Sequence, residues 1–195
     1  MTARDREKTG APRPVISSLD RSDYDELWLF AVDVGEGLTD EDRAAILRFR
    51  ARGGGLMITR DHMDLGCSIC TLGPVGQAHV FNTHNIDGPV PPPDDRGTPY
   101  IHWPNFHSGA NGDFQRVEAA LPVHPVMRDT ASETGAVRYL PSHPHEGAVI
   151  APASDPSARV IATGSSLASG QRFNIAVAFE GSGNEGRAIA GSTVH

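Results

Sequence analysis

The sequence predicts an α/β fold in which a βαβ unit is followed by a strand-rich C-terminal half. Residues 24–34 (YDELWLFAVDV) form a mostly apolar run of strand-favouring side chains, which predicts a buried parallel strand. A helical pattern over 39–52 and a second apolar run at 56–59 follow, so the two strands are expected to be parallel neighbours. Trp28 and Phe30 lie inside the first run and are assigned to the core.

The helix has sequence signals at both ends. Thr39 is followed by Asp42, a Thr with an acid at the position that closes a capping box. Ile46 and Phe49 belong to one apolar face. Gly53 comes just after the last periodic residue and can adopt the left-handed conformation that ends a helix.

The middle of the chain has weaker signals, and the last third is rich in strand signals. We expect a short helix over 65–72, an extended piece over 79–82 and a short helix over 114–120. Residues 88–99 (GPVPPPDDRGTP) are expected to run over the surface, because proline removes hydrogen-bond donors and fixes φ. Short apolar runs between turn residues predict strands at 136–140, 148–151, 159–163, 173–179 and 187–194.

The bulk properties favour one acidic domain. The 195 residues suit a single domain over 15–195, preceded by a disordered tail over 1–14. The net charge of −7 disfavours a nucleic-acid or anionic-membrane partner. No apolar run has the roughly 20 residues of a membrane span, and no secretion signal opens the chain, so a soluble cytoplasmic protein is expected. The end of the chain in an apolar run at Val194 predicts a truncated gene product or an incomplete domain, with a short natural form as the alternative.

Two groups of ionisable side chains are the candidate site. Asp61 and His62 follow the strand at 56–59, and ligands of open α/β sheets bind beyond the carboxyl ends of the strands. His145 and Glu146 follow the strand predicted at 136–140 and would face them as a second acid–base pair. The alternative interpretation is that the loop histidines are solvated, and that those before proline, such as His124, cap turns.

Two further motifs favour structural interpretations. Residues 181–186 (GSGNEG) match the GxGxxG nucleotide fingerprint, but a strand follows where that fingerprint needs a helix, so a hairpin loop is predicted. Cys67 and Cys70 have CxxC spacing, with His79 and His84 further on. The gap to His79 is short for a zinc finger, so two semi-buried, small apolar residues are favoured over structural zinc or thiol redox chemistry.

Several segments together resemble a known family. Residues 24–30 (YDELWLF), an LT pair before an acidic helix start, and 53–56 (GGGL) are similar to the class I glutamine amidotransferase-like superfamily. Within it, the trehalose-utilisation (ThuA-like) branch is the most similar, and 124–128 (HPVMR) and 187–195 (RAIAGSTVH) resemble later parts of that branch. The resemblance implies a flavodoxin-like, mostly parallel sheet. The first strand of that family is missing or reduced to residues 14–17 here. The exposed sheet edge would favour pairing with another chain, as in a homo-oligomer, or a loss of activity altogether.

The resemblance does not imply glutaminase activity. Members with that activity carry a Cys nucleophile in the turn after the strand matched here by 56–59, whereas this chain has Asp61 and His62 there and Cys67 comes several residues later. His145 and Glu146 match the family's His–Glu element only in part. A triad of Cys67, His145 and Glu146 is an alternative that needs only spatial convergence.

Three functional hypotheses follow from the sequence, and whether the chain is an enzyme is left open. The first is a domain that binds, and hydrolyses or isomerises, a small polar, carbohydrate-like metabolite, with Asp61 as base or orienting carboxylate and His62, His145 and Glu146 as its acid–base partners. The second is a non-catalytic binding or assembly domain that has lost the nucleophile. The third is a metal-dependent enzyme, since His, Asp and Glu are ligands for a divalent metal, although the sequence identifies no certain cofactor.

Overall fold

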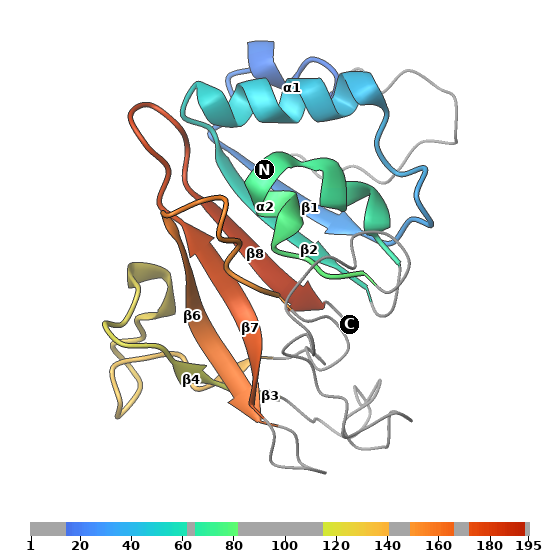
Figure 1. Ribbon diagram of the computed structural model, residues 1–195. Coiled ribbons are helices and arrows are strands. Elements are labelled where there is room, and N and C mark those ends of the chain that lie inside the picture. The colour runs from blue at the N-terminus through green and yellow to red at the C-terminus, as the bar shows by residue number, and fades with distance from the viewer. Residues whose placement is uncertain (1–14, 62–64, 82–114, 141–148, 166–171, 194–195) are drawn as a thin grey trace.

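The computed structural model describes residues 15–61, 65–81, 115–140, 149–165 and 172–193, and it has an α/β fold (Figure 1). Its main feature is a six-stranded sheet with the order β1-β2-β8-β7-β6-β4. The strands are β1 (Glu26–Ala31), β2 (Gly55–Arg60), β4 (Glu118–Ala119), β6 (Ala158–Ser165), β7 (Arg172–Phe179) and β8 (Ala188–Thr193). The tail predicted at 1–14 and the surface excursion at 88–99 lie outside the described residues.

The sheet is mixed, so the expectation of a mostly parallel sheet is wrong for the described strands. β1 pairs with β2, and β2 with β8, in parallel, whereas the pairs β8–β7, β7–β6 and β6–β4 are antiparallel. The reason lies in the connections. A parallel return needs a crossover of about a dozen residues or more. The segments 166–171 and 180–187 are too short for one, so β6, β7 and β8 turn back on each other as hairpins.

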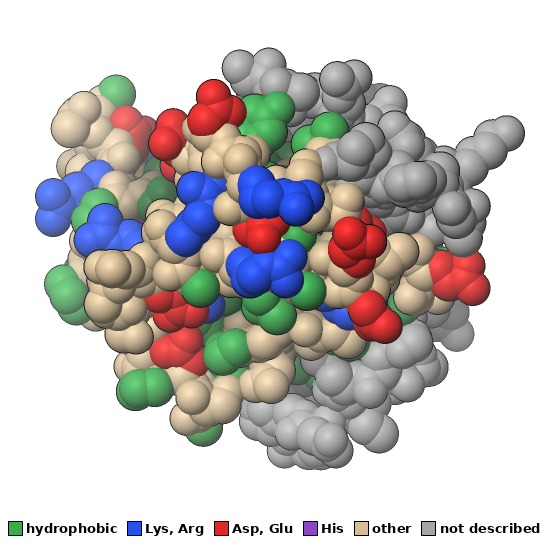
Figure 2. All heavy atoms as spheres, turned by 90° about the horizontal axis from the view of Figure 1, so that it is seen from above, with side chains coloured by type: hydrophobic (Ala, Val, Ile, Leu, Met, Phe, Trp, Pro, Cys, Tyr) green, Lys and Arg blue, Asp and Glu red, His purple; other side chains and the backbone are tan. Residues whose placement is uncertain are grey.

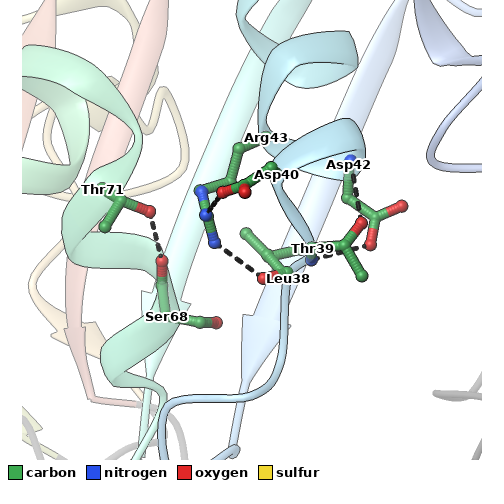
Figure 3. A network of polar contacts seen from close by, with 7 residues as sticks. All are labelled: Leu38, Thr39, Asp40, Asp42, Arg43, Ser68 and Thr71. Carbon is green, nitrogen blue, oxygen red and sulfur yellow. Dashed lines mark hydrogen bonds and ion pairs between the residues drawn. The ribbon is translucent and has the colours of Figure 1, made fainter. Parts of the chain in front are cut away.

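Helix α1 (Asp40–Ala51) confirms the sequence signals at both of its ends. The Thr39 side chain accepts from the Asp42 amide (3.1 Å) and the Asp42 carboxylate accepts from the Thr39 amide (3.0 Å), which completes the capping box (Figure 3). Gly53 has a φ of 104°. The amides of Gly53 and Gly54 donate to the carbonyls of Arg50 and Phe49, so the helix ends in a Schellman motif.

The main core lies on the face of the sheet that α1 covers. Ile46 and Phe49 of α1 are fully buried against Leu56 and Ile58 of β2. The same cluster contains Val75, so the 3₁₀ helix η2 (Cys67–Thr71) and helix α2 (Gly73–Gln77) cover that face as well. The 3₁₀ helix η2 lies within the range 65–72 where a short helix is expected, and α2 follows directly after that range. No helix within the described ranges is long and apolar enough to cross a membrane.

Strand β1 is parallel to β2 as predicted, but it is not buried. It is the edge strand of the sheet, and its side chains alternate between partly buried and exposed positions. Trp28 is 63% exposed and Phe30 is 52% exposed. Their assignment to the core is therefore wrong. An apolar strand is buried on both faces only where other elements cover both faces of the sheet, and α1 covers only one of them.

The helix expected over 114–120 is also wrong. Gln115–Arg116 and Glu118–Ala119 are the short strands β3 and β4, and β3 pairs with β5 (Tyr139–Leu140). Val117 is buried between two exposed neighbours, Arg116 and Glu118, which is the two-residue period of a strand. The strands expected at 159–163, 173–179 and 187–194 are confirmed as β6, β7 and β8. Of the runs expected at 79–82 and 148–151, residues 79–81 and 149–151 are described, and they meet in an isolated antiparallel bridge between His79 and Val149.

The loop with the GxGxxG letters is a hairpin between β7 and β8, as predicted. It is also joined to the end of α1. The Gly186 amide donates to the Arg50 carbonyl (2.7 Å), and Arg50 Nε donates to the Gly186 carbonyl (3.1 Å). Arg50 is 3% exposed and forms an ion pair with Glu185 (2.9 Å). A Cβ on Gly186 would overlap the Gly54 carbonyl, so the two backbones approach at a distance that only glycine permits. We call these contacts the Arg50 joint.

Candidate functional site

The carboxyl ends of β1, β2 and β8 lie at one edge of the sheet, because the three strands are parallel (Figure 1). Asp61 follows β2 directly, and its amide donates to the carbonyl of Ala31 at the end of β1 (3.1 Å). On the other side of β2, Arg60 is the register partner of Thr193 in β8. Asp61 is partly exposed. The structure therefore has this predicted site residue at the expected edge, with access to solvent.

Asp33 organises the segments that follow β1 and β2. It is 7% exposed, and its Oδ1 accepts from the amide of Gly35 (2.8 Å). The Ser68 hydroxyl donates to Asp33 Oδ2 (2.8 Å), and the Ser68 amide donates to Oδ1 (3.3 Å). The Asp33 carbonyl accepts from the Gly66 amide (2.6 Å). One carboxylate thus ties the loop after β1 to the start of η2.

Ser68 is itself held inside η2. The Thr71 hydroxyl donates to the Ser68 carbonyl (2.9 Å), one helical turn away (Figure 3). Gly37 lies so close that an added Cβ would overlap the Asp33 carboxylate. Because its oxygens are engaged within the chain, Asp33 positions the edge and is not itself presented to a ligand.

A buried cation lies at the same edge. Arg60, the last residue of β2, is 2% exposed, and its Nη2 donates to the Val80 carbonyl (2.9 Å). Its guanidinium lies over the Phe81 ring, 4.1 Å from the ring centroid. His79 is fully buried nearby. Burial, together with the charge of Arg60, holds the pKa of His79 well below its usual value of 6.5, so this imidazole is neutral at pH 7.

The two cysteines are free, and they fit the prediction of small semi-buried residues. Cys67 is buried and Cys70 is partly buried. Burial raises the pKa of the Cys70 thiol above its usual 9.0, which lowers its thiolate fraction. Within the described residues, no three His, Cys, Asp or Glu side chains lie close enough together to hold a metal ion.

Of the predicted site residues, only Asp61 lies in the described part of the chain. His62, His145 and Glu146 lie outside it, so their convergence with Asp61 stays a prediction. His124 does cap a turn: its Nδ1 accepts from the Val126 amide (3.2 Å).

The sequence analysis missed three residues at the edge: Asp33, Arg60 and Ser68. Asp33 had a detectable signal, because a single acid inside an apolar run just before Gly35 needs hydrogen-bond partners when it is buried. Ser68 had none, since its role depends on a contact with a residue 35 positions away.

Comparison with protein-family models, with curated proteins and with solved structures gives no match to this chain. The family resemblance of the sequence therefore stays a prediction. The α/β architecture and the arrangement of its sheet rest on the structure itself.

We predict that Asp33 and Ser68 are energetically coupled. Asp33→Ala, Ser68→Ala and the double variant form a double-mutant cycle, measured by urea unfolding. A buried hydrogen bond to a charged group contributes about 1.5–3 kcal/mol, so the coupling should be at least about 1 kcal/mol. Asp23→Ala, which removes an exposed acid, is the control and should change stability by less than about 0.5 kcal/mol. A cycle in which the single effects simply add would contradict the contact.

We also predict that His79 makes stability depend on pH. Below pH 6.5 the unfolded chain binds a proton at His79 that the folded chain excludes. The free energy of unfolding should therefore fall as the pH drops through this window, by at most ~1.4 kcal/mol per pH unit from this group. In His79→Gln that contribution is absent, so the difference between variant and wild type should change between pH 7 and pH 5.5. Parallel pH profiles would contradict the prediction.

Proposed function

We propose that the chain is a domain of the class I glutamine amidotransferase-like superfamily, closest to its ThuA-like branch, with a flavodoxin-like fold. It binds a small polar, carbohydrate-like metabolite at the carboxyl edge of β1, β2 and β8, and it has no glutaminase activity. The proposal includes a cytoplasmic location and a homo-oligomeric state. It includes no nucleic-acid partner, because the net charge is −7.

One observation carries the proposal: Asp61 is partly exposed at the end of β2, beside the end of β1. A carboxylate in this position can accept hydrogen bonds from the hydroxyl groups of a polyol. Arg60 is buried at the same edge, so this part of the sheet carries a positive charge as well as a carboxylate. Hydrolysis or isomerisation would then use Asp61 as base, with His62, His145 and Glu146 as acid–base partners.

The thiols support the absence of glutaminase activity. A nucleophilic thiolate needs a lowered pKa and access to substrate. Cys67 is buried, and the pKa of Cys70 is raised by burial. Neither cysteine therefore has the properties of an activated nucleophile.

Two alternatives remain part of the proposal. A non-catalytic assembly domain is favoured by the exposed aromatic side chains of β1. A metal-dependent enzyme would need ligands from His62, His145 or Glu146 in addition to Asp61. Ligand binding is measured after treatment of the protein with EDTA and again after re-addition of Mn²⁺. Binding that is lost and then restored supports the metal-dependent version, and unchanged binding supports the metal-free one.

We predict that Asp61→Asn and His145→Ala weaken binding of a sugar probe. Glucose and trehalose are the probes, and saturation-transfer difference NMR measures binding. Loss of one hydrogen bond to a charged group should weaken binding roughly 10-fold to 100-fold, from about 1.5–3 kcal/mol. Asp23→Asn is the matched control and should bind as wild type does.

Unchanged binding in both site variants would contradict the site. A wild-type protein that binds neither sugar would contradict the carbohydrate-like ligand, and release of glutamate from glutamine would contradict the absence of glutaminase activity.

A further inference from the structure

The imidazole ring of His124 has a defined partner on each of its two nitrogens. Its Nδ1 accepts from the Val126 amide (3.2 Å), and its Nε2 lies 3.0 Å from Oε1 of Glu180. The residue is 7% exposed. It directly precedes the 3₁₀ helix η4 (Pro125–Met127), and Glu180 directly follows β7. One side chain therefore caps η4 and joins it to the end of β7.

These two contacts assign the hydrogen on the ring. A backbone amide only donates, so Nδ1 of His124 must offer a lone pair to Val126. A carboxylate only accepts, so Nε2 must carry the hydrogen that is donated to Glu180. The ring is therefore the neutral imidazole with its hydrogen on Nε2.

The two partners of the ring respond to a second proton in opposite ways. Protonation adds a hydrogen at Nδ1, where it would face the N–H of Val126, and two donors cannot bond to each other. The bond from Nε2 to the Glu180 carboxylate is kept, and it becomes charge-assisted and stronger. A proton on His124 thus removes the cap of η4 and strengthens the contact to the end of β7.

The charged groups near the ring come from the neighbouring strands. The second oxygen of Glu180 lies 3.3 Å from Nε of Arg187, which directly precedes β8 and is 80% exposed. Arg159 of β6 donates to the Pro122 carbonyl (3.1 Å), two residues before His124. The carboxylate that bonds to the ring is therefore bound on its other side to an arginine in contact with water.

Within the described part of the chain, no other charged side chain bonds to the ring of His124. On its own segment, Arg128 and Asp129 follow η4. The basic side chains that gather over α1 and η1 (Leu19–Arg21) belong to another part of the surface (Figure 2), since residues 120–140 lie beside β4 and β6 (Figure 1). A change in the charge of His124 therefore acts first on Val126 and Glu180.

We propose that His124 is a pH-sensitive switch for η4. The neutral ring caps η4 through Nδ1, whereas the ring that has taken a proton from water releases the Val126 amide and stays bound to Glu180 as an ion pair. Met127 of η4 belongs to a buried cluster with Val117 and Ile161. Release of the cap therefore loosens a turn that packs against the β4–β6 side of the sheet, while the strands keep their pairing.

NMR of the full chain tests the switch between about pH 8 and pH 5, the range in which histidine usually changes charge. At the upper end, the ring ¹⁵N shifts of His124 should show a hydrogen on Nε2 alone, and at the lower end a hydrogen on both nitrogens. As Nδ1 gains its hydrogen, the protection factor of the Val126 amide should fall about fivefold, the size expected for loss of one capping hydrogen bond. The Ala131 amide is the internal control, because it donates to a carboxylate oxygen of Asp129 (2.9 Å) and should keep its protection.

His124→Asn is the matched variant, because the side-chain oxygen of asparagine can cap the same amide and does not change charge. In this variant, the Val126 amide should be equally protected at both ends of the pH range. Loss of protection that persists in His124→Asn would overturn the proposal, since His79 is present in both proteins and would then be its source. A wild-type ring that keeps Nδ1 free of hydrogen at the lower pH would also overturn it, as would a protonated ring that leaves Val126 unchanged.

Discussion

The Arg50 joint is the contact on which the rest of the structure depends. It connects the end of α1 to the loop before β8 across 136 residues of sequence, through two backbone-linked hydrogen bonds and an ion pair with Glu185. The Arg50 guanidinium is buried, and its Nε and Nη1 are engaged by the Gly186 carbonyl and the Glu185 carboxylate, so the joint is specific to this geometry. It keeps β8 beside β2. Without that pairing, the carboxyl ends of the three parallel strands would not share an edge.

The two carboxylates at this edge have different roles because their surroundings differ. Asp33 is enclosed by Gly35 and Ser68 and holds the loops in place. Asp61 also directly follows a strand, but it is partly exposed. The edge strand β1 is a separate surface, because Trp28 and Phe30 are exposed on the face of the sheet opposite α1.

Local signals in the sequence predicted the elements that form from local contacts. Thr39, Asp42 and Gly53 act within a few residues of each other, so the helix and both of its ends were predictable. The hairpin nature of the GxGxxG loop was predictable for the same reason. What could not be predicted depends on distant partners. The exposure of Trp28 depends on which strand ends the sheet, and the role of Ser68 depends on its contact with Asp33. Both are consequences of packing, which no local pattern records.

Native-state hydrogen exchange of Arg50→Met tests the central claim most directly, because methionine keeps a long side chain but removes the donors and the charge. Arg187→Met, which changes an exposed arginine at the start of β8, is the matched control. We predict that the amides of β8 and of the facing part of β2 lose protection together, by about 2 kcal/mol, whereas those of the β6–β7 hairpin lose less. Loss of protection confined to the last turn of α1, with β8 unchanged, would contradict the role of the Arg50 joint.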